Sequence, residues 1–309
     1  MFNKSKPLIL LYIITMRNLN LFRNIIRVII FVLIFSSCKN ESGIEKTNVL
    51  FLHHSTGAVL WQGNSSSSLQ SFALKISDRL ANILAPEGQL QVLFGNYNRE
   101  NKKNYIIKEQ IFPKAEPYGW QNYPFDYYNI WVRNGGANSF KEEPTLEILT
   151  QQYKVIIFKH CFPVSNIMQD QDTVDINSNI KTSGNYKLQY EALKEKLHQF
   201  PNTKFILFTG AAQVEAAITP DEALRAKEFF SWVLEVWDVE NDNIYLWDFY
   251  NLQTEGGLYF KNEYAVSPED SHPNTEFAGK VVPLLFNRII DVLENDGKNT
   301  QVNGEKKLL

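Results

Sequence analysis

Short apolar runs alternate along the chain with longer segments in which apolar residues recur at helical spacing. The apolar runs predict five strands, at Val49–Leu52, Gln91–Phe94, Tyr153–Phe158, Lys204–Phe208 and Asn243–Phe249. The periodic segments predict helices at Leu69–Leu84, Tyr186–Phe200, Pro220–Val239 and Asn274–Leu293. Strands that alternate with helices indicate a parallel sheet covered on both faces. We therefore predict one three-layer α/β/α domain over residues 48–294.

One long segment, Asn98–Pro144, breaks this alternation and fits neither the strand period nor the helix period. It is rich in Tyr, Trp, Phe, Pro and Asn and is too long for an idle connection. Its aromatic side chains can stack on sugar rings or cap an acyl pocket, and they can equally form an irregular covering of the core. Residues 295–309 are polar and predict a flexible tail.

The N-terminus has the layout of an export signal. Arg17, Arg23 and Arg27 precede the apolar run Val28–Phe35, and two serines stand directly before Cys38. The apolar run is shorter than the roughly 20 residues that a membrane span needs. Small residues followed by a cysteine make this segment similar to a bacterial lipoprotein signal. The resemblance implies a lipid on Cys38 that anchors the protein to a membrane of the cell envelope.

This interpretation assigns residues 1–38 to the signal, with Met16 as the true start, and residues 39–47 to a polar tether. We expect the domain to face the periplasm or the cell surface. The chain has two cysteines, so a lipid on Cys38 leaves Cys161 unpaired. The formal net charge of −3 provides no basic surface for nucleic acid.

Candidate chemistry follows the first predicted strand, in the sequence HHSTG that contains Ser55. A second group lies in the sequence SPEDSHPN, between the last strand and the last helix, where His272 follows Glu269 and Asp270. Both segments belong to the carboxyl edge of a parallel sheet, where reactive groups collect. A serine becomes a nucleophile when a histidine takes its proton and a carboxylate orients that histidine. We predict a catalytic triad of Ser55, His272 and one of the two carboxylates.

These two motifs and their placement resemble the SGNH/GDSL hydrolase family over almost the whole chain after the tether. The resemblance implies a flavodoxin-like order of the five strands and ester hydrolysis without a cofactor. The glycine and aspartate of the family's Gly-Asp-Ser-Leu motif are missing before Ser55. The family's acid usually stands three residues before the histidine, where this chain has Glu269. Asp270 stands two residues before it, as in SGNH-like O-acetyltransferases, and we take Asp270 as the acid and Glu269 as the alternative.

The residues that would bind the oxyanion stay open. The family's Gly-x-Asn-Asp motif has no literal match, and the sequence KHCF, from Lys159, stands in its place. The candidates are Gly95, Gly135, Gly136 and Asn166.

We expect a monomeric serine esterase or deacetylase of the cell envelope that acts on a small-molecule or carbohydrate ester. One alternative is an SGNH-like O-acyltransferase, and another is a non-catalytic lipoprotein that binds glycans through the aromatic segment. A third is a zinc site built from His53, His54, His160 and His272. Adjacent histidines on a strand point to opposite faces, which disfavours zinc, and we expect no metal or other cofactor.

Overall fold

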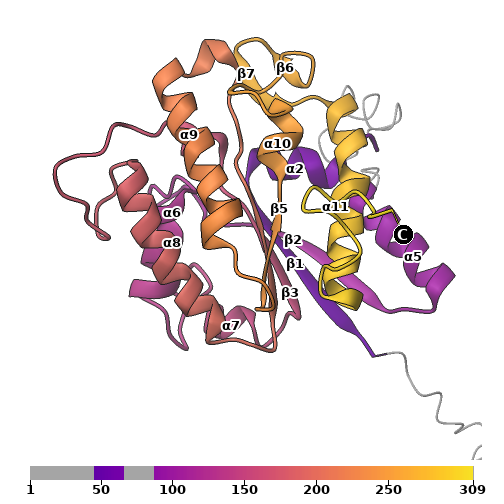
Figure 1. Cartoon of the computed structure of the whole chain (residues 1–309). Coiled ribbons are helices and arrows are strands. Elements are labelled where there is room, and N and C mark those ends of the chain that lie inside the picture. Colours follow the sequence, from indigo (N-terminus) through magenta and orange to yellow (C-terminus); the bar gives the residue numbers. More distant parts are fainter. Residues whose placement is uncertain (1–44, 66–86, 309) are drawn as a thin grey trace, which may run out of the picture. The chain divides into compact units, whose positions relative to one another are not determined.

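A five-stranded sheet is the centre of the structure, a computed structural model that describes residues 45–65 and 87–308. The strands are β1 (Thr47–His53), β2 (Tyr105–Ile111), β3 (Val155–Phe158), β4 (Lys204–Phe208) and β5 (Ile244–Trp247). They lie in the order β2-β1-β3-β4-β5, and each neighbouring pair is parallel (Figure 1). This is the strand order of the SGNH hydrolases, so the predicted α/β fold class is confirmed.

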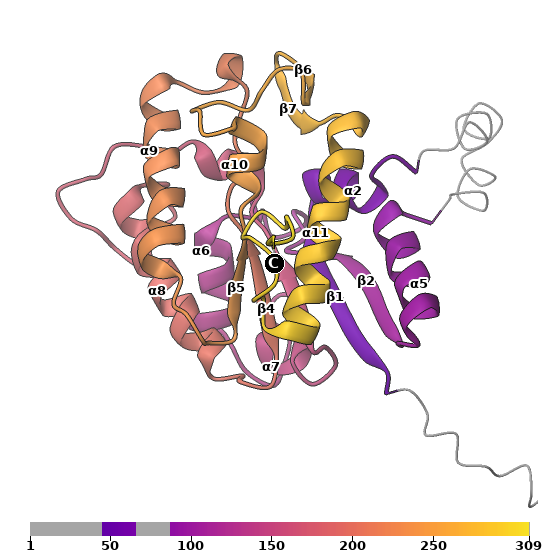
Figure 2. The same cartoon turned by 45° about the vertical axis from the view of Figure 1, so that its right-hand side comes forward.

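Helices cover both faces of the sheet (Figures 1 and 2). One layer contains three helices in mutual contact, α2 (Ser55–Gln62), α5 (Gln89–Asn101) and α11 (Thr275–Asn295). The other layer contains α6 (Pro124–Tyr127), α8 (Ser183–His198) and α9 (Pro220–Trp232). The shorter elements are η1 (Tyr128–Arg133), α7 (Leu146–Leu149), η2 (Phe162–Ser165), η3 (Glu215–Ala217), η4 (Val233–Trp237), α10 (Phe249–Thr254), β6 (Ala265–Ser267) and β7 (Asp270–Pro273).

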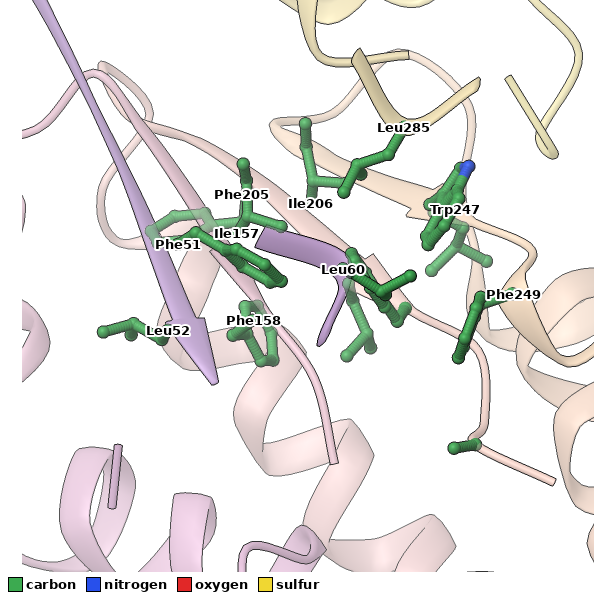
Figure 3. Packing of buried hydrophobic residues seen from close by; sticks show 14 of the residues in the cluster. Phe51, Leu52, Leu60, Ile157, Phe158, Phe205, Ile206, Trp247, Phe249 and Leu285 are labelled. Atoms are coloured by element: carbon green, nitrogen blue, oxygen red, sulfur yellow. The ribbon is translucent and has the colours of Figure 1, made fainter. Parts of the chain in front are cut away.

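The core lies between the sheet and these two helical layers. Side chains from β1, β3, β4 and β5 gather with Leu60 of α2 and Leu285 of α11 (Figure 3). Phe51 of β1 stacks on Phe208 of β4, with 5.6 Å between the ring centroids. Burying each such aliphatic or aromatic side chain contributes about 1.5–3 kcal/mol. The apolar side chains therefore hold the strands in place and fix where their polar carboxyl ends emerge.

One predicted strand is wrong. Residues 91–94 lie inside α5, where Leu90 and Phe94 are buried and Val92 is exposed, which is a helical pattern. The true second strand, β2, lies in the segment that we expected to be irregular. It is an edge strand that exposes Lys108 and Glu109, so it lacks a continuous apolar run.

The remaining strands and the later helices are confirmed, with ends that differ from the predicted ones by at most seven residues. α9 begins with a capping box, in which Thr219 accepts a hydrogen bond from the N–H of Glu222. α9 ends earlier than expected and continues as the π-helical turn η4. The predicted helix at residues 69–84 and the whole signal with Cys38 lie outside the described residues. Within residues 45–65 and 87–308, no helix is both long and apolar enough to cross a membrane.

The residues after α11, which we expected to be a flexible tail, make specific contacts with the domain. Asp291 accepts hydrogen bonds from the backbone N–H groups of Asn299 and Thr300, at 2.9 and 2.7 Å from Oδ2. The Nε1 of Trp247 donates to the carbonyl of Asn303 at 2.9 Å. These contacts do not fit a frayed segment, because backbone groups of the tail bond buried side chains of α11 and β5.

Candidate active site

Ser55 is the first residue of α2, directly beyond the carboxyl end of β1. The helix can start this close to the strand because Gly57 has no side chain. A Cβ at Gly57 would lie 2.2 Å from the Cβ of His53, far closer than van der Waals contact. Ser55 is exposed, and its hydroxyl makes no hydrogen bond within the part of the chain that the structure describes. The predicted nucleophile is therefore accessible at the expected edge of the sheet.

His272 and Asp270 form a tight pair on β7, in the small β6–β7 hairpin. The Nδ1 of His272 lies 2.6 Å from Oδ1 of Asp270, and the same oxygen accepts the backbone N–H of His272 at 2.9 Å. These two hydrogen bonds hold the pKa of Asp270 below its usual value. The ring of Phe162 packs perpendicular to the imidazole, with ring centroids 5.1 Å apart and planes at 89°.

The alternative acid, Glu269, does not contact this histidine. Its carboxylate accepts a hydrogen bond from the hydroxyl of Ser267, with 3.1 Å between the oxygens. Of the two candidate acids, the structure pairs Asp270 with His272.

The two halves of the predicted triad come from neighbouring elements. α2, which carries Ser55, contacts β7, which carries His272. No hydrogen bond between Ser55 and His272 is present among the described residues. Ser55 and the Asp–His pair therefore lie in neighbouring elements at the same edge of the sheet, but the serine and the histidine are not hydrogen-bonded in the described residues.

The four candidates for the oxyanion site lie in different parts of the fold. Gly95 lies in the middle of α5, where its backbone N–H belongs to the helix. Gly135 lies near Lys196, in the last turn of α8 before β4, so it and the adjacent Gly136 are at the amino edge of the sheet. None of these three glycines belongs to the carboxyl edge that carries Ser55.

Asn166 follows η2 on the carboxyl edge, close to the β6–β7 hairpin. Its Oδ1 accepts a hydrogen bond from Nε2 of Gln213 at 2.9 Å, which leaves the amide N–H groups of Asn166 to donate elsewhere. Val214, the residue directly after Gln213, is bonded to the hairpin, since its N–H donates to Oγ of Ser271 at 3.1 Å. Among the four candidates, Asn166 is the one whose hydrogen-bond partner, Gln213, precedes a residue bonded to the β6–β7 hairpin.

The other histidines are each engaged separately. Nε2 of His53 pairs with Glu109 at 2.8 Å, and Nε2 of His54 contacts the carbonyl of Pro113. His160 is fully buried, bonds the hydroxyl of Tyr190 at 2.9 Å, and has its pKa lowered by burial to about 3. Burial also lowers the pKa of His54.

The histidines that we considered as zinc ligands therefore bind separate partners. Among the described residues, no three His, Cys, Asp or Glu side chains are arranged to hold a metal ion. Cys161 is a free thiol in the structure.

The aromatic segment before β3 packs mainly onto the core. Trp120, Tyr123, Tyr127 and Trp131 are all less than a tenth exposed, whereas Tyr118 is 38% exposed. Of the two interpretations of this segment, the structure supports the irregular covering more than an open platform for sugars.

The sequence analysis did not predict that Lys159, the residue that follows β3, is buried. Its side chain is completely buried, and Nζ has no hydrogen-bond partner in the described part of the chain. Burial lowers the pKa of this amine. The only signal in the sequence is a lysine directly behind a fully apolar strand, and lysines at strand ends are usually exposed.

Comparisons with known proteins add little to this geometry. No family model and no curated protein matches the chain. A solved structure is similar, described as a carbohydrate esterase whose active site displays divergent catalytic and non-catalytic binding functions. It is 10% identical with a TM-score of 0.35, and the match covers 80% of this chain and 66% of that chain.

Proposed function

We propose that this protein is a serine hydrolase that cleaves an ester, with Ser55 as nucleophile, His272 as general base and Asp270 as the residue that orients the base. The observation that carries the proposal is the 2.6 Å pair of His272 and Asp270, on a strand that contacts the helix bearing Ser55. The distant likeness to a carbohydrate esterase is consistent with it but carries no argument of its own.

The chemistry follows from which atoms are engaged. Nδ1 of His272 is bound to Asp270, which leaves Nε2 to take the proton of Ser55 as its Oγ attacks the ester carbonyl. The carboxylate of Asp270 stabilises the imidazolium that forms. Nε2 then returns the proton to the departing alcohol, and a water activated in the same way releases the acid from Ser55.

The negative charge on the carbonyl oxygen needs hydrogen-bond donors. The backbone N–H of Ser55 is in the first turn of α2 and has no partner among the described residues. It can donate together with the side-chain amide of Asn166. We propose an acylated carbohydrate or a small acetyl ester as substrate. If an alcohol replaced the water, the same acyl-enzyme would transfer its acyl group instead.

The first test replaces the members of the triad and measures turnover of a chromogenic acetyl ester. Ser55→Ala should lower kcat by about a thousandfold or more with little change in melting temperature, because the side chain is exposed. His272→Ala should be about as damaging, and Asp270→Asn similar or somewhat milder. Ser267→Ala and Glu269→Gln, on the same hairpin, are matched controls that should stay near wild type.

A fluorophosphonate probe gives an independent readout. It should label the wild type at Ser55 and should not label Ser55→Ala. Full turnover by Ser55→Ala would rule out the hydrolase, and the non-catalytic lipoprotein would then be the better hypothesis.

We also propose that the protein is held at a membrane of the cell envelope by a lipid on Cys38. Cys38→Ser should move the protein from the membrane fraction to the soluble fraction, because stable anchoring of a polar domain needs the acyl chains. Mass spectrometry of the wild type should find the chain starting at an acylated Cys38. An unmodified cysteine behind an intact signal would contradict this anchor.

A further inference from the structure

A fully buried lysine lies at the carboxyl end of β3. The exposed fraction of Lys159 is 0%, and its Nζ has no hydrogen-bond partner among the described residues. Burying an amine without a partner is unfavourable in both of its protonation states, since the ammonium loses hydration and the amine loses hydrogen bonds. Groups that a fold holds at such a cost are concentrated where ligands bind.

The direction of the Lys159 side chain follows from its neighbours. The next residue, His160, packs against Tyr127 and Tyr190, which belong to the layer of α6 and α8. Phe158, the last residue of β3, packs against the same Tyr127. Because side chains alternate along extended backbone, the intervening Lys159 points to the opposite layer, that of α2 and α11. The register agrees, because Leu52 pairs with Phe158, which places Lys159 next to His53.

The N-terminal turn of α2 lies over this same place. α2 approaches His53 so closely that Gly57 cannot carry a Cβ. The backbone N–H groups of Ser55 and Thr56 have no partner in the described residues, and the hydroxyl of Thr56 is buried and also unpaired. His54, the residue that precedes the helix, provides no side-chain cap. The positive end of the helix is therefore uncapped beside a buried amine.

We propose that the first turn of α2 and Lys159 together form a site for a small carboxylate anion. The N–H groups of Ser55 and Thr56 donate to the carboxylate, and Lys159 supplies positive charge from beneath the turn. An anion bound there favours the charged form of the amine. The site extends the proposed function, because a carboxylate is the product of ester hydrolysis, but binding does not require Ser55 to act as a nucleophile.

The test measures binding of acetate to the full-length protein by titration calorimetry, with sodium chloride at equal ionic strength as the blank. Wild type should bind acetate, and Lys159→Met should bind it about tenfold more weakly or worse, since a nearby opposite charge is lost. Lys204→Met removes the same charge at the amino edge of the sheet and should bind like wild type. Ser55→Ala keeps its backbone N–H and should also bind acetate.

Melting temperatures separate this role from a structural one. Lys159→Met should melt at or above the wild-type temperature, because it removes an unpaired buried amine. Lys159→Gln is a second neutral variant for the case in which methionine does not fit. Wild-type binding that does not exceed the chloride blank would overturn the site, and so would unchanged acetate affinity in a folded neutral variant.

The outcomes also separate this site from the hydrolase. Acetate binding that depends on Lys159 in a protein without esterase activity would support the anion site and reject the proposed function. Esterase activity that depends on Ser55, with acetate affinity independent of Lys159, would do the reverse.

Discussion

Two groups of buried polar side chains in this domain differ in how completely they are hydrogen-bonded. The first, which we call the α11 network, consists of Arg288, Asp291 and Thr300. Nη1 of Arg288 donates to the carbonyl of Gly297 at 3.0 Å and to the hydroxyl of Thr300 at 3.2 Å. Oδ2 of Asp291 accepts from the hydroxyl of Thr300 at 2.7 Å. Each charged group of the α11 network has several partners.

The second group lies at the carboxyl edge of the sheet, and its members keep an unpaired polar atom. These buried atoms are Oγ1 of Thr56, Oδ1 of Asn122, Nζ of Lys159 and Nδ1 of His160. Buried polar groups are nearly always bonded in folded proteins, so these four need an explanation, as do other unpaired buried atoms of the described residues, such as Oδ1 of Asn48 at the amino end of β1. The fully bonded α11 network serves stability, whereas Lys159 and Thr56 are the unpaired groups that we propose to face a ligand.

The largest effect on stability should come from the α11 network. Asp291→Ala removes the acceptor of two backbone N–H groups and of the Thr300 hydroxyl. It also removes one of the two carboxylates near Arg288, the other being Asp238. We expect a loss of about 3 kcal/mol in the free energy of unfolding, measured by urea denaturation.

The matched control is Glu276→Ala, which removes an exposed carboxylate from the same helix. It should change stability far less than Asp291→Ala does, because solvent screens an exposed ion pair. Equal effects of the two substitutions would show that the buried α11 network adds nothing beyond an ordinary surface pair.

Burial on both faces made most of the sheet predictable. β3 and β4 lie in the middle, so their sequences are continuous apolar runs. β2 is at the edge, and exposed polar residues such as Lys108 and Glu109 hide it. The short run around Phe94 was ambiguous, because four apolar residues fit a strand and a buried helical stripe equally well.

For the site, the sequence predicted only which residues follow the ends of the strands. The topology implies that Ser55 and His272 share an edge, but the choice between Asp270 and Glu269 depends on the local turn. Only the structure shows that Asp270 bonds the imidazole of His272. The burial of Lys159 could not be predicted, because a lysine directly behind an apolar strand is usually exposed and the local sequence does not mark this one as different.

A smaller effect is expected from Asp126, a buried carboxylate of the carboxyl edge. Its Oδ2 accepts the backbone N–H groups of Gln121 and Asn122, each at 2.7 Å. Burial outweighs these bonds and raises the pKa of Asp126 to about 6. A raised pKa means that the folded state holds the proton more tightly than the unfolded chain does, so stability falls as pH rises from about 4 to about 6.

Asp126→Asn keeps an oxygen for the two N–H groups but carries no charge. The variant should therefore be more stable than wild type by about 2 kcal/mol at pH 8, and the gain should disappear near pH 4. Urea denaturation at the two pH values measures this, with Asp172→Asn, an exposed carboxylate, as the control. A gain of the same size at both pH values would mean that charge is not its cause. A loss at pH 8 would show that the carboxylate of Asp126 is stabilised as an anion, which would place it with the fully bonded α11 network instead.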